Sequence, residues 1–439
     1  MQKGKIKTGR GKTYSCKVPY LIQYHINQKF DLVVGNPPFK SAKTGSIEPE
    51  ASIYCKEQGF AQEMVLPFLH RATFFCNKEG TVSIVSTSKI LFNKSGGYNK
   101  FREFLFQKNY VDAVFNFSAL RKPKKGQGKS IFAHAVGPSC VLFYRKKPSV
   151  QVNPNITYVC PKPTERDRYS DSLVLDELDY FFLPRNECEK PDSIIWKVGM
   201  WGIDYDFQLI KKMISGRLLK DYLTKENGWF YGGGLKFLTP TKDKEYINNE
   251  INLYPIIEAK HISRYFTDES KLKHINETLT DKNIEFYLNY YNVSTSNDLP
   301  VINLFRHEGF VKGYSSPHVL IKEGQSDKKF CASFFNFDCC FKDTITGITY
   351  NKQGLNEKAL SAKTNLLKAI TAYLNSKFAS YYLFLSSVSW GIERERVTAK
   401  DTFELPALPF EMEEEKVNKL SQKLMKYLKS LQKISGMKQ

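Results

Sequence analysis

The stretch from Asp31 to Phe39 reads DLVVGNPPF, and it decides the fold expected for the first part of the chain. An apolar run that ends in glycine, asparagine and two prolines predicts a buried strand over 30–34 and a turn after it. Further apolar strands at 81–87, 111–117 and 140–145 alternate with helix-like segments, and apolar positions at helical spacing predict one of these helices over 57–77. This order predicts an open α/β sheet, and such sheets bind ligands where their strands end.

The residue types in this turn suit chemistry on an exocyclic amino group. The side-chain oxygen of Asn36 and the backbone carbonyl of Pro37 can accept both amino hydrogens, which favours attack by the nitrogen on a methyl sulfonium. Pro37 and Pro38 hold that carbonyl rigidly, and Phe39 offers a face on which a base turned out of a duplex can stack. The alternative is that Asn36 and Pro37 only form a tight turn after a buried strand and take no part in catalysis.

The stretch resembles motif IV of amino-methyltransferases that use S-adenosylmethionine, in particular the DNA adenine N6 class. The chain is similar to the type I and type IIG (Eco57I-like) restriction-modification group in the order of its later segments, over roughly residues 30 to 430. Those segments are 63–92, FREFLF, VDAVFNF, SCVLFYRK, GWFYGGGLKFLTPTKDKEYI, YPIIEAKHISRYF, LLKAITAYLNSKFASYYLF and ELPALPF. Proteins that methylate glutamine, and some RNA guanine methyltransferases, share the Asn-Pro-Pro-aromatic core, so this core fixes the chemistry better than the substrate.

The resemblance implies a partial Rossmann-like methyltransferase sheet, then an α+β target-recognition domain, then a C-terminal helix. We expect a partial catalytic domain over 1–150, a linker over 151–219, the recognition domain over 220–410 and the helix over 411–439. The helix shows apolar positions at three-and-four spacing from Val417 to Ile434. It can be a packed terminal helix or a partner-binding coiled coil.

The charge of the chain favours a polyanionic partner, here double-stranded DNA. There are 65 Lys and Arg against 45 Asp and Glu, a net charge of +20. The candidate phosphate contacts are Arg121, Lys122, Lys124, Lys125 and Lys129 in one loop, and Arg264, Arg394 and Arg396 further along. A solvated loop, and surface pairs of the last two arginines with Glu393 and Glu395, are the alternatives.

The cofactor implied by the resemblance is S-adenosylmethionine, but no glycine-rich turn after a strand is found for it. Only 35 residues precede Asn36. The glycines at 232–234 follow Phe230 at the right offsets, yet KFLTPTKDK after them predicts no helix. Cofactor-binding residues therefore stay unassigned, and we expect a second polypeptide to supply the S-adenosylmethionine-binding half. The alternative is a catalytically incomplete specificity subunit, or a remnant, that only binds DNA.

The nine cysteines form no CxxC pair, which argues against a zinc site or a disulfide framework. No metal site is expected. No apolar run is long enough for a membrane span, and the basic N-terminus lacks the apolar core of a signal peptide. The protein is thus expected to be cytoplasmic, with reduced thiols and no membrane contact.

Overall fold

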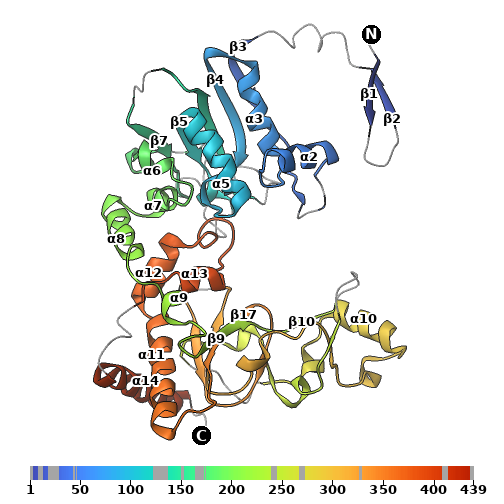
Figure 1. Ribbon diagram of the computed structural model, residues 1–439, viewed down its shortest axis with the longest axis vertical. Helices are drawn as coiled ribbons and strands as arrows, with labels where there is room; N and C mark the ends of the chain where they lie inside the picture. Colours follow the sequence, from blue (N-terminus) through green and yellow to red (C-terminus); the bar gives the residue numbers. More distant parts are fainter. Residues whose placement is uncertain are drawn as a thin grey trace. The chain divides into compact units, whose positions relative to one another are not determined.

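The computed structural model describes residues 3–7, 13–17, 29–42, 45, 47–121, 137–149, 153–163, 173, 175–238, 245–265, 272–325, 329–407 and 414–435. The chain divides into two compact units, Met1–Asp204 and Tyr205–Gln439, here called unit 1 and unit 2. Figure 1 labels the helices and strands of both units.

Unit 1 is built on a six-stranded mixed sheet with the order β3-β4-β6-β5-β7-β8. Strand β3 pairs in parallel with β4, and β5 pairs in parallel with β7, while the remaining pairs are antiparallel. The four strands expected from the sequence are all present. The strands are β3 (Phe30–Gly35), β4 (Cys76–Thr87), β5 (Asn109–Asn116), β6 (Ser139–Lys146), β7 (Asn155–Val159) and β8 (Tyr180–Pro184).

The two last strands of this sheet lie within 151–219, where the sequence predicted a linker. In β7, Ile156 and Tyr158 point into the core and are fully buried. This five-residue strand stands between proline-rich and charged segments, so its alternation is too short to be recognised from the sequence. The boundary between the two compact units lies at residue 204, whereas the catalytic domain was expected to end at 150. The difference arises because β7 and β8 complete the first sheet.

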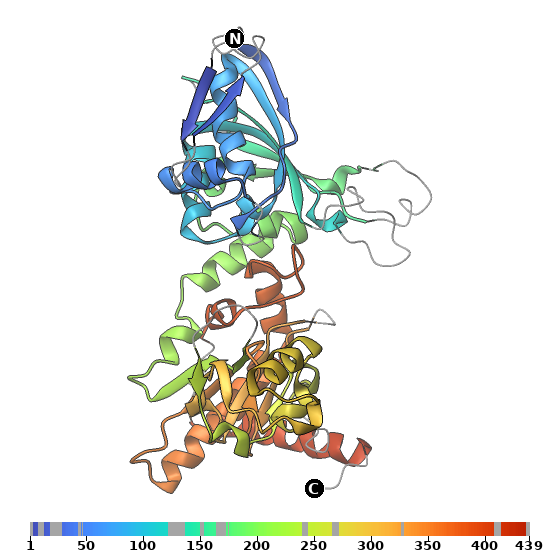
Figure 2. The same cartoon turned by 90° about the vertical axis from the view of Figure 1, so that its right-hand side faces the viewer.

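Helices cover one face of the sheet, as Figure 1 shows for α3 and α5, and Figure 2 shows the strands side by side with α3 against them. On this face Val82, Leu142 and Tyr144 are fully buried, and the Tyr144 hydroxyl donates to the Leu69 carbonyl of α3 at 2.5 Å. Pro67 lies in the first turn of α3, where proline is tolerated. The helices of unit 1 are α2 (Pro49–Glu57), α3 (Val65–Phe75), α4 (Lys89–Phe92), α5 (Gly96–Arg102), α6 (Arg185–Cys188) and α7 (Ile195–Trp201).

The opposite face of the same sheet is apolar but open. Leu32 and Val34 on β3 are 60% and 68% exposed, and Phe182 on β8 is 67% exposed. Between them, the rings of Phe115 and Phe143 pack together at 5.3 Å and remain half-buried. We call this surface the open face. A separate antiparallel hairpin precedes the sheet and consists of β1 (Lys3–Lys7) and β2 (Thr13–Lys17).

Unit 2 has an α+β fold, as expected for the second part of the chain. Its largest sheet is antiparallel, with the order β15-β14-β17-β9. Its strands are β9 (Trp229–Gly233), β10 (Lys236–Phe237), β11 (Tyr246–Ile247), β12 (Ile256–Ile257), β13 (Leu304–His307), β14 (His318–Lys322), β15 (Ala332–Phe335), β16 (Cys340–Phe341) and β17 (Ile345–Tyr350). Its helices are α8 (Asp204–Ile214), α9 (Leu219–Tyr222), α10 (Asp281–Tyr291), α11 (Glu357–Leu374), α12 (Lys377–Ser386), α13 (Ala399–Phe403) and α14 (Glu414–Ser435).

The terminal helix α14 packs against α11. Asn365 on α11 donates to the Asn418 side chain at 3.1 Å and accepts from the Ser421 hydroxyl at 3.2 Å. Leu424 is buried at the same interface. The first part of the apolar face of α14 therefore packs against α11 and stabilises unit 2.

The cysteines whose side chains the structure describes are all buried, and none of them forms a disulfide. Unit 1 holds Cys55, Cys76, Cys140, Cys160 and Cys188, and unit 2 holds Cys331, Cys339 and Cys340. Burial raises the pKa of Cys140, Cys160 and Cys340 to about 12, so these thiols stay protonated at neutral pH.

The fully buried His318 on β14 makes unit 2 sensitive to acid. Burial lowers the pKa of His318 to about 4, while in the unfolded chain it titrates near 6.5. Between these two values only the unfolded chain gains the proton, so stability is lost as pH falls from about 6.5 to about 4. We expect the free energy of unfolding of unit 2 to fall by about 2 kcal/mol between pH 7 and pH 5 because of His318. Hydrogen exchange of β14 in urea titrations at both pH values measures it.

The matched variant is His318→Phe, which keeps a ring beside Phe335 and removes the titrating group. Its unfolding free energy should change less between the two pH values than that of the natural chain. Equal pH dependence in both proteins would show that other groups control the acid response.

Candidate active site at the end of strand β3

Asn36, Pro37, Pro38 and Phe39 follow directly after β3, at the edge of the sheet where the parallel strands β3 and β4 both end. Pro37 is buried, whereas Asn36 is exposed and the Phe39 side chain is 42% exposed. The amide group and the aromatic ring are thus accessible to a ligand, and the proline between them fixes the backbone.

The chain after this turn is held by a second short segment. The Met64 amide donates to the Lys40 carbonyl at 2.9 Å, and the Ala42 amide donates to the Gln62 carbonyl at 3.1 Å. Ser41 and Glu63 form an antiparallel bridge between these bonds. Backbone pairing therefore determines the path of the chain that leaves Phe39.

Glu63 links this second segment to the helices that follow β4. Its carboxylate is 3.2 Å from the Lys89 ammonium group on α4, and it also accepts from the Tyr98 hydroxyl on α5. The Glu63 side chain is 12% exposed, so the pair is shielded from solvent. Gly97 allows the approach, because a Cβ there would lie 2.5 Å from the Ala61 amide nitrogen.

A buried polar network lies at the ends of β4 and β5. The Asn116 side-chain oxygen accepts from the Ser88 hydroxyl at 3.0 Å and from the Ser118 hydroxyl at 2.6 Å. The Asn116 amide group donates to the Tyr158 hydroxyl at 2.6 Å, and burial raises the pKa of Tyr158 well above its usual value. The network fixes the turns at this edge of the sheet.

The sequence analysis did not identify Glu63, Lys89 or Asn116. For Asn116 a signal existed, because polar residues come directly after the apolar runs of both β4 and β5. For the Glu63 pair there was none, since its partners are 26 and 35 residues away in the sequence.

The candidate DNA contacts are placed only in part. Arg121 follows the short helix at 118–120, while Lys122, Lys124, Lys125 and Lys129 lie outside the described residues. In unit 2 the Arg264 guanidinium donates to the Asn375 carbonyl at the end of α11. Arg394 is exposed, and no carboxylate pairs with it in the described part of the chain.

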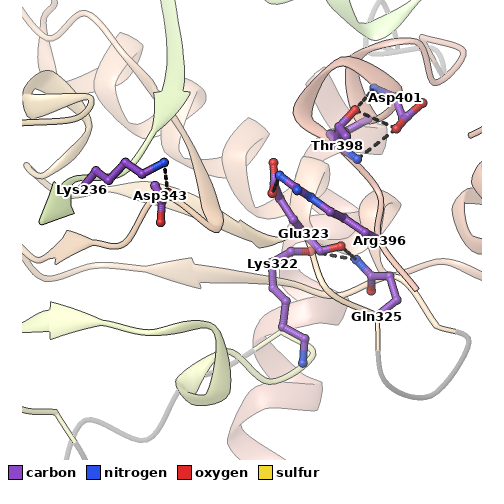
Figure 3. Close-up of polar contacts among 9 residues, drawn as sticks. Lys236, Lys322, Glu323, Gln325, Asp343, Arg396, Thr398 and Asp401 are labelled. Atoms are coloured by element: carbon purple, nitrogen blue, oxygen red, sulfur yellow. Dashed lines mark hydrogen bonds and ion pairs between the residues drawn. The ribbon is translucent and has the colours of Figure 1, made fainter. Parts of the chain in front are cut away.

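Arg396 forms an ion pair with Glu323, and Figure 3 shows its guanidinium against that carboxylate. The pair differs from the expected alternatives, Glu393 and Glu395, because Glu323 comes from the end of β14. Burial raises the pKa of Glu323 despite the neighbouring charge of Arg396. Arg396 thus connects the loop before α13 to the sheet of unit 2.

Residues 5–122 match the family model of the Eco57I restriction-modification methylases. Over these residues the chain is similar to that family. The match ends at 122 and includes the turn from Asn36 to Phe39, so the Eco57I methylase segment contains β3, β4, β5 and the loop contacts described above.

Solved structures of restriction-modification enzymes are similar to most of the chain at low identity. The type IIG restriction endonuclease BpuSI is 15% identical with a TM-score of 0.36, over 91% of this chain and 49% of that one. The type IIL enzyme MmeI in complex with DNA is 13% identical with a TM-score of 0.47, over 92% and 49%. The DrdV–DNA complex is 14% identical with a TM-score of 0.44, over 92% and 45%.

The chain thus spans about half the length of these three proteins. No curated protein matches it. Among the described residues, no helix is long and apolar enough to cross a membrane, and no cluster of three His, Cys, Asp or Glu side chains could hold a metal ion.

Strand β3 lies at the edge of its sheet within the described part of unit 1. No described strand pairs with the outer edge of β3, and the β1–β2 hairpin before it is antiparallel and belongs to another sheet. Of the glycines at 232–234, Gly232 and Gly234 serve packing within unit 2. Gly234 lets two segments of unit 2 approach, because a Cβ there would lie 2.0 Å from the Phe341 carbonyl oxygen.

Proposed function

We propose that the chain is a component of a site-specific DNA adenine N6-methyltransferase in a restriction-modification system. The Eco57I family match over 5–122 supports methyl transfer. The observation that carries the proposal is the accessible pair of Asn36 and Phe39 on a backbone fixed by Pro37, at the end of β3.

The geometry suits an adenine amino group. The nitrogen is a poor nucleophile because its lone pair is delocalised into the ring. Hydrogen bonds from its two hydrogens to the Asn36 side-chain oxygen and the Pro37 carbonyl favour the pyramidal form in which the lone pair is available. These acceptors are fixed before the reaction, and such preorganised groups stabilise the charge that develops on the nitrogen. Phe39 holds the base by stacking once it has left the duplex.

A second polypeptide completes the enzyme in this proposal and brings the site for the methyl donor, S-adenosylmethionine. Two features of unit 1 support it. The outer edge of β3 has no partner among the described strands, and the open face leaves Leu32 and Val34 more than half exposed. An exposed apolar edge strand invites pairing with another chain.

Double-stranded DNA is the proposed substrate. The net charge of +20 supports binding to a polyanion. Unit 2, whose bounds include the expected recognition domain at 220–410, would supply most of the contacts. Its arginine at 394 is exposed and available for a phosphate, whereas Arg264 and Arg396 already bond within unit 2.

A second candidate function is DNA recognition without catalysis. The net charge of +20 supports DNA binding, which needs no methyl donor. The experiment that separates the two uses unmethylated genomic DNA and S-adenosylmethionine with a labelled methyl group. The chain is assayed alone and together with the polypeptide encoded directly upstream. Labelled N6-methyladenine after digestion to nucleosides supports the enzyme, and bound but unmodified DNA in both assays supports the binding module.

The proposed function needs an aromatic residue at position 39, because the base stacks on the face of its ring. In the complete enzyme we expect Phe39→Trp to keep most of the methylation rate. Phe39→Ala should lower the methylation rate about five- to hundredfold. Both substitutions are made at a side chain that is 42% exposed, so stability should change little. Methylation rates at low and saturating DNA measure the effect. Equal activity of the Ala and Trp variants would contradict a stacking role.

A further inference from the structure

Unit 2 contains a cavity of about 650 Å³ beside the edge strand β9. Its walls come from three places in the sequence: α9 and the turn after it, β9 itself, and the segment around 310–312. The residues that carry the argument are Lys220, Lys225, Phe230, Tyr231, Phe310 and Lys312. The volume falls within the range of small-molecule sites and is far larger than a simple ion requires.

Glycines fix the wall formed by Phe310. The Phe310 amide donates to the Gly233 carbonyl on β9 at 2.9 Å. A Cβ on Gly232 would lie 2.8 Å from the Phe310 Cβ, and one on Gly313 would lie 2.2 Å from the Phe310 ring. Only glycine at both positions lets the ring take this place, so the shape of the cavity is set by the fold.

The charge in the cavity is positive. Lys220, Lys225 and Lys312 line it together with one acid, Glu226. All three lysines are exposed, and none forms an ion pair with a carboxylate in the described part of unit 2. Glu226 is at the surface, where hydrogen bonds from its own backbone amide and from Thr224, and then the charge of Lys225, lower its pKa. Three ammonium groups around one carboxylate favour an anionic ligand.

Aromatic rings accompany these charges. The Lys312 ammonium group lies 4.8 Å from the centre of the half-buried Phe230 ring. Tyr231 is 46% exposed, and its ring packs on Phe403 with centroids 4.1 Å apart, which holds it in one orientation. Lysines interleaved with aromatic rings are the combination that binds the phosphates and the base of an unstacked nucleotide.

We propose that this cavity binds one unstacked nucleotide of a DNA strand, with its flanking phosphates at Lys220, Lys225 and Lys312 and its base against Phe230. The inference rests on the proposed DNA-binding function and adds to it a second place where a nucleotide is held, in unit 2. Binding by stacking on a base outside the duplex depends little on which base it is, because every base has a flat face. The cavity therefore serves strand separation or strand holding.

Photocrosslinking of the full chain tests the position of the base. The probe is a short DNA duplex with a small single-stranded gap that carries iododeoxyuridine, a base that forms adducts with adjacent aromatic side chains on irradiation. We expect the adduct on the peptide that contains Phe230 and Tyr231. Free thymidine monophosphate should compete only weakly, because it lacks the flanking phosphates. Strong competition would show a free nucleotide as the ligand and overturn the DNA proposal.

Variants test the contacts by fluorescence anisotropy with the same gapped duplex. Phe230→Ala should weaken binding about five- to hundredfold, and Phe230→Tyr, which keeps the ring, should restore it. Lys220→Ala and Lys312→Ala should each lower the slope of log affinity against log salt by about 0.7 to 0.9 for each phosphate that the variant no longer neutralises. The matched control is Lys282→Ala, an exposed lysine on α10 outside the cavity.

The outcomes separate this inference from the proposed function. If the chain binds DNA but the adduct lies elsewhere, or the cavity variants behave like Lys282→Ala, the cavity proposal is wrong and DNA binding stands. If the chain and its complex with the second polypeptide both fail to bind DNA, the proposed function fails as well. The wild-type crosslink needs no substitution, so a variant that fails to fold does not affect it.

Discussion

Asn36→Ala should reduce methyl transfer by the complete enzyme about 10² to 10³-fold. An acceptor that acts on developing charge contributes about 3 to 4 kcal/mol to the transition state, and the alanine removes one of the two acceptors proposed for the amino group. Asn36 is exposed, so the folded structure should tolerate the change. Single-turnover methylation rates, with DNA affinity measured in parallel, test the prediction.

The matched variant is Asn36→Asp, which keeps an acceptor oxygen at the same place. It should retain more activity than the alanine variant, and both should bind DNA about as tightly as the natural chain. A loss of affinity without a loss of the single-turnover rate would assign Asn36 to binding. Unchanged methylation by Asn36→Ala would remove it from the site.

Val34→Asp should weaken the proposed complex with a second polypeptide about 10² to 10⁴-fold. Val34 is 68% exposed on β3 in the present structure and lies on the open face. In the proposed complex it becomes buried, and an unpaired buried charge costs about 3 to 5 kcal/mol. The isolated chain should keep its stability, because the new carboxylate stays in water. Sedimentation of the two polypeptides together measures the complex.

The control is Leu178→Asp, which changes a side chain that is 81% exposed outside the sheet and should leave the complex intact. Calorimetry with S-adenosylmethionine completes the test. We expect binding by the complex and none by this chain alone. Micromolar binding by the isolated chain would show that it holds its own donor site and needs no second polypeptide.

Local signals in the sequence were enough to predict part of the fold. The strands expected at 30–34, 81–87, 111–117 and 140–145 are present because each is an apolar run bounded by turn residues. A helix expected over 57–77 is shorter, since Gly59 has a φ of +69° and the helix begins at Val65. Residues 58–64 instead form the segment that holds the turn after Phe39.

What the sequence could not provide are contacts between distant residues. The NPPF turn is a local pattern and could be found. The Glu63 contacts with Lys89 and Tyr98, and the pair of Arg396 with Glu323, depend on the folded chain. The cavity beside β9 was missed for the same reason, because Phe310 reaches Gly232 only after the long stretch of sequence between them has folded.

The buried thiols provide a means of timing the unfolding of each unit. Five of them lie in unit 1 and three in unit 2, and each has no access to an alkylating reagent until its surroundings open. The rate of modification at each cysteine therefore measures the free energy of opening around it, by the logic of hydrogen exchange. Peptide mapping distinguishes Cys140 from Cys340 in one sample. A single labelling experiment can thus show whether the half that carries Asn36 opens before the half that carries the lysine-lined cavity.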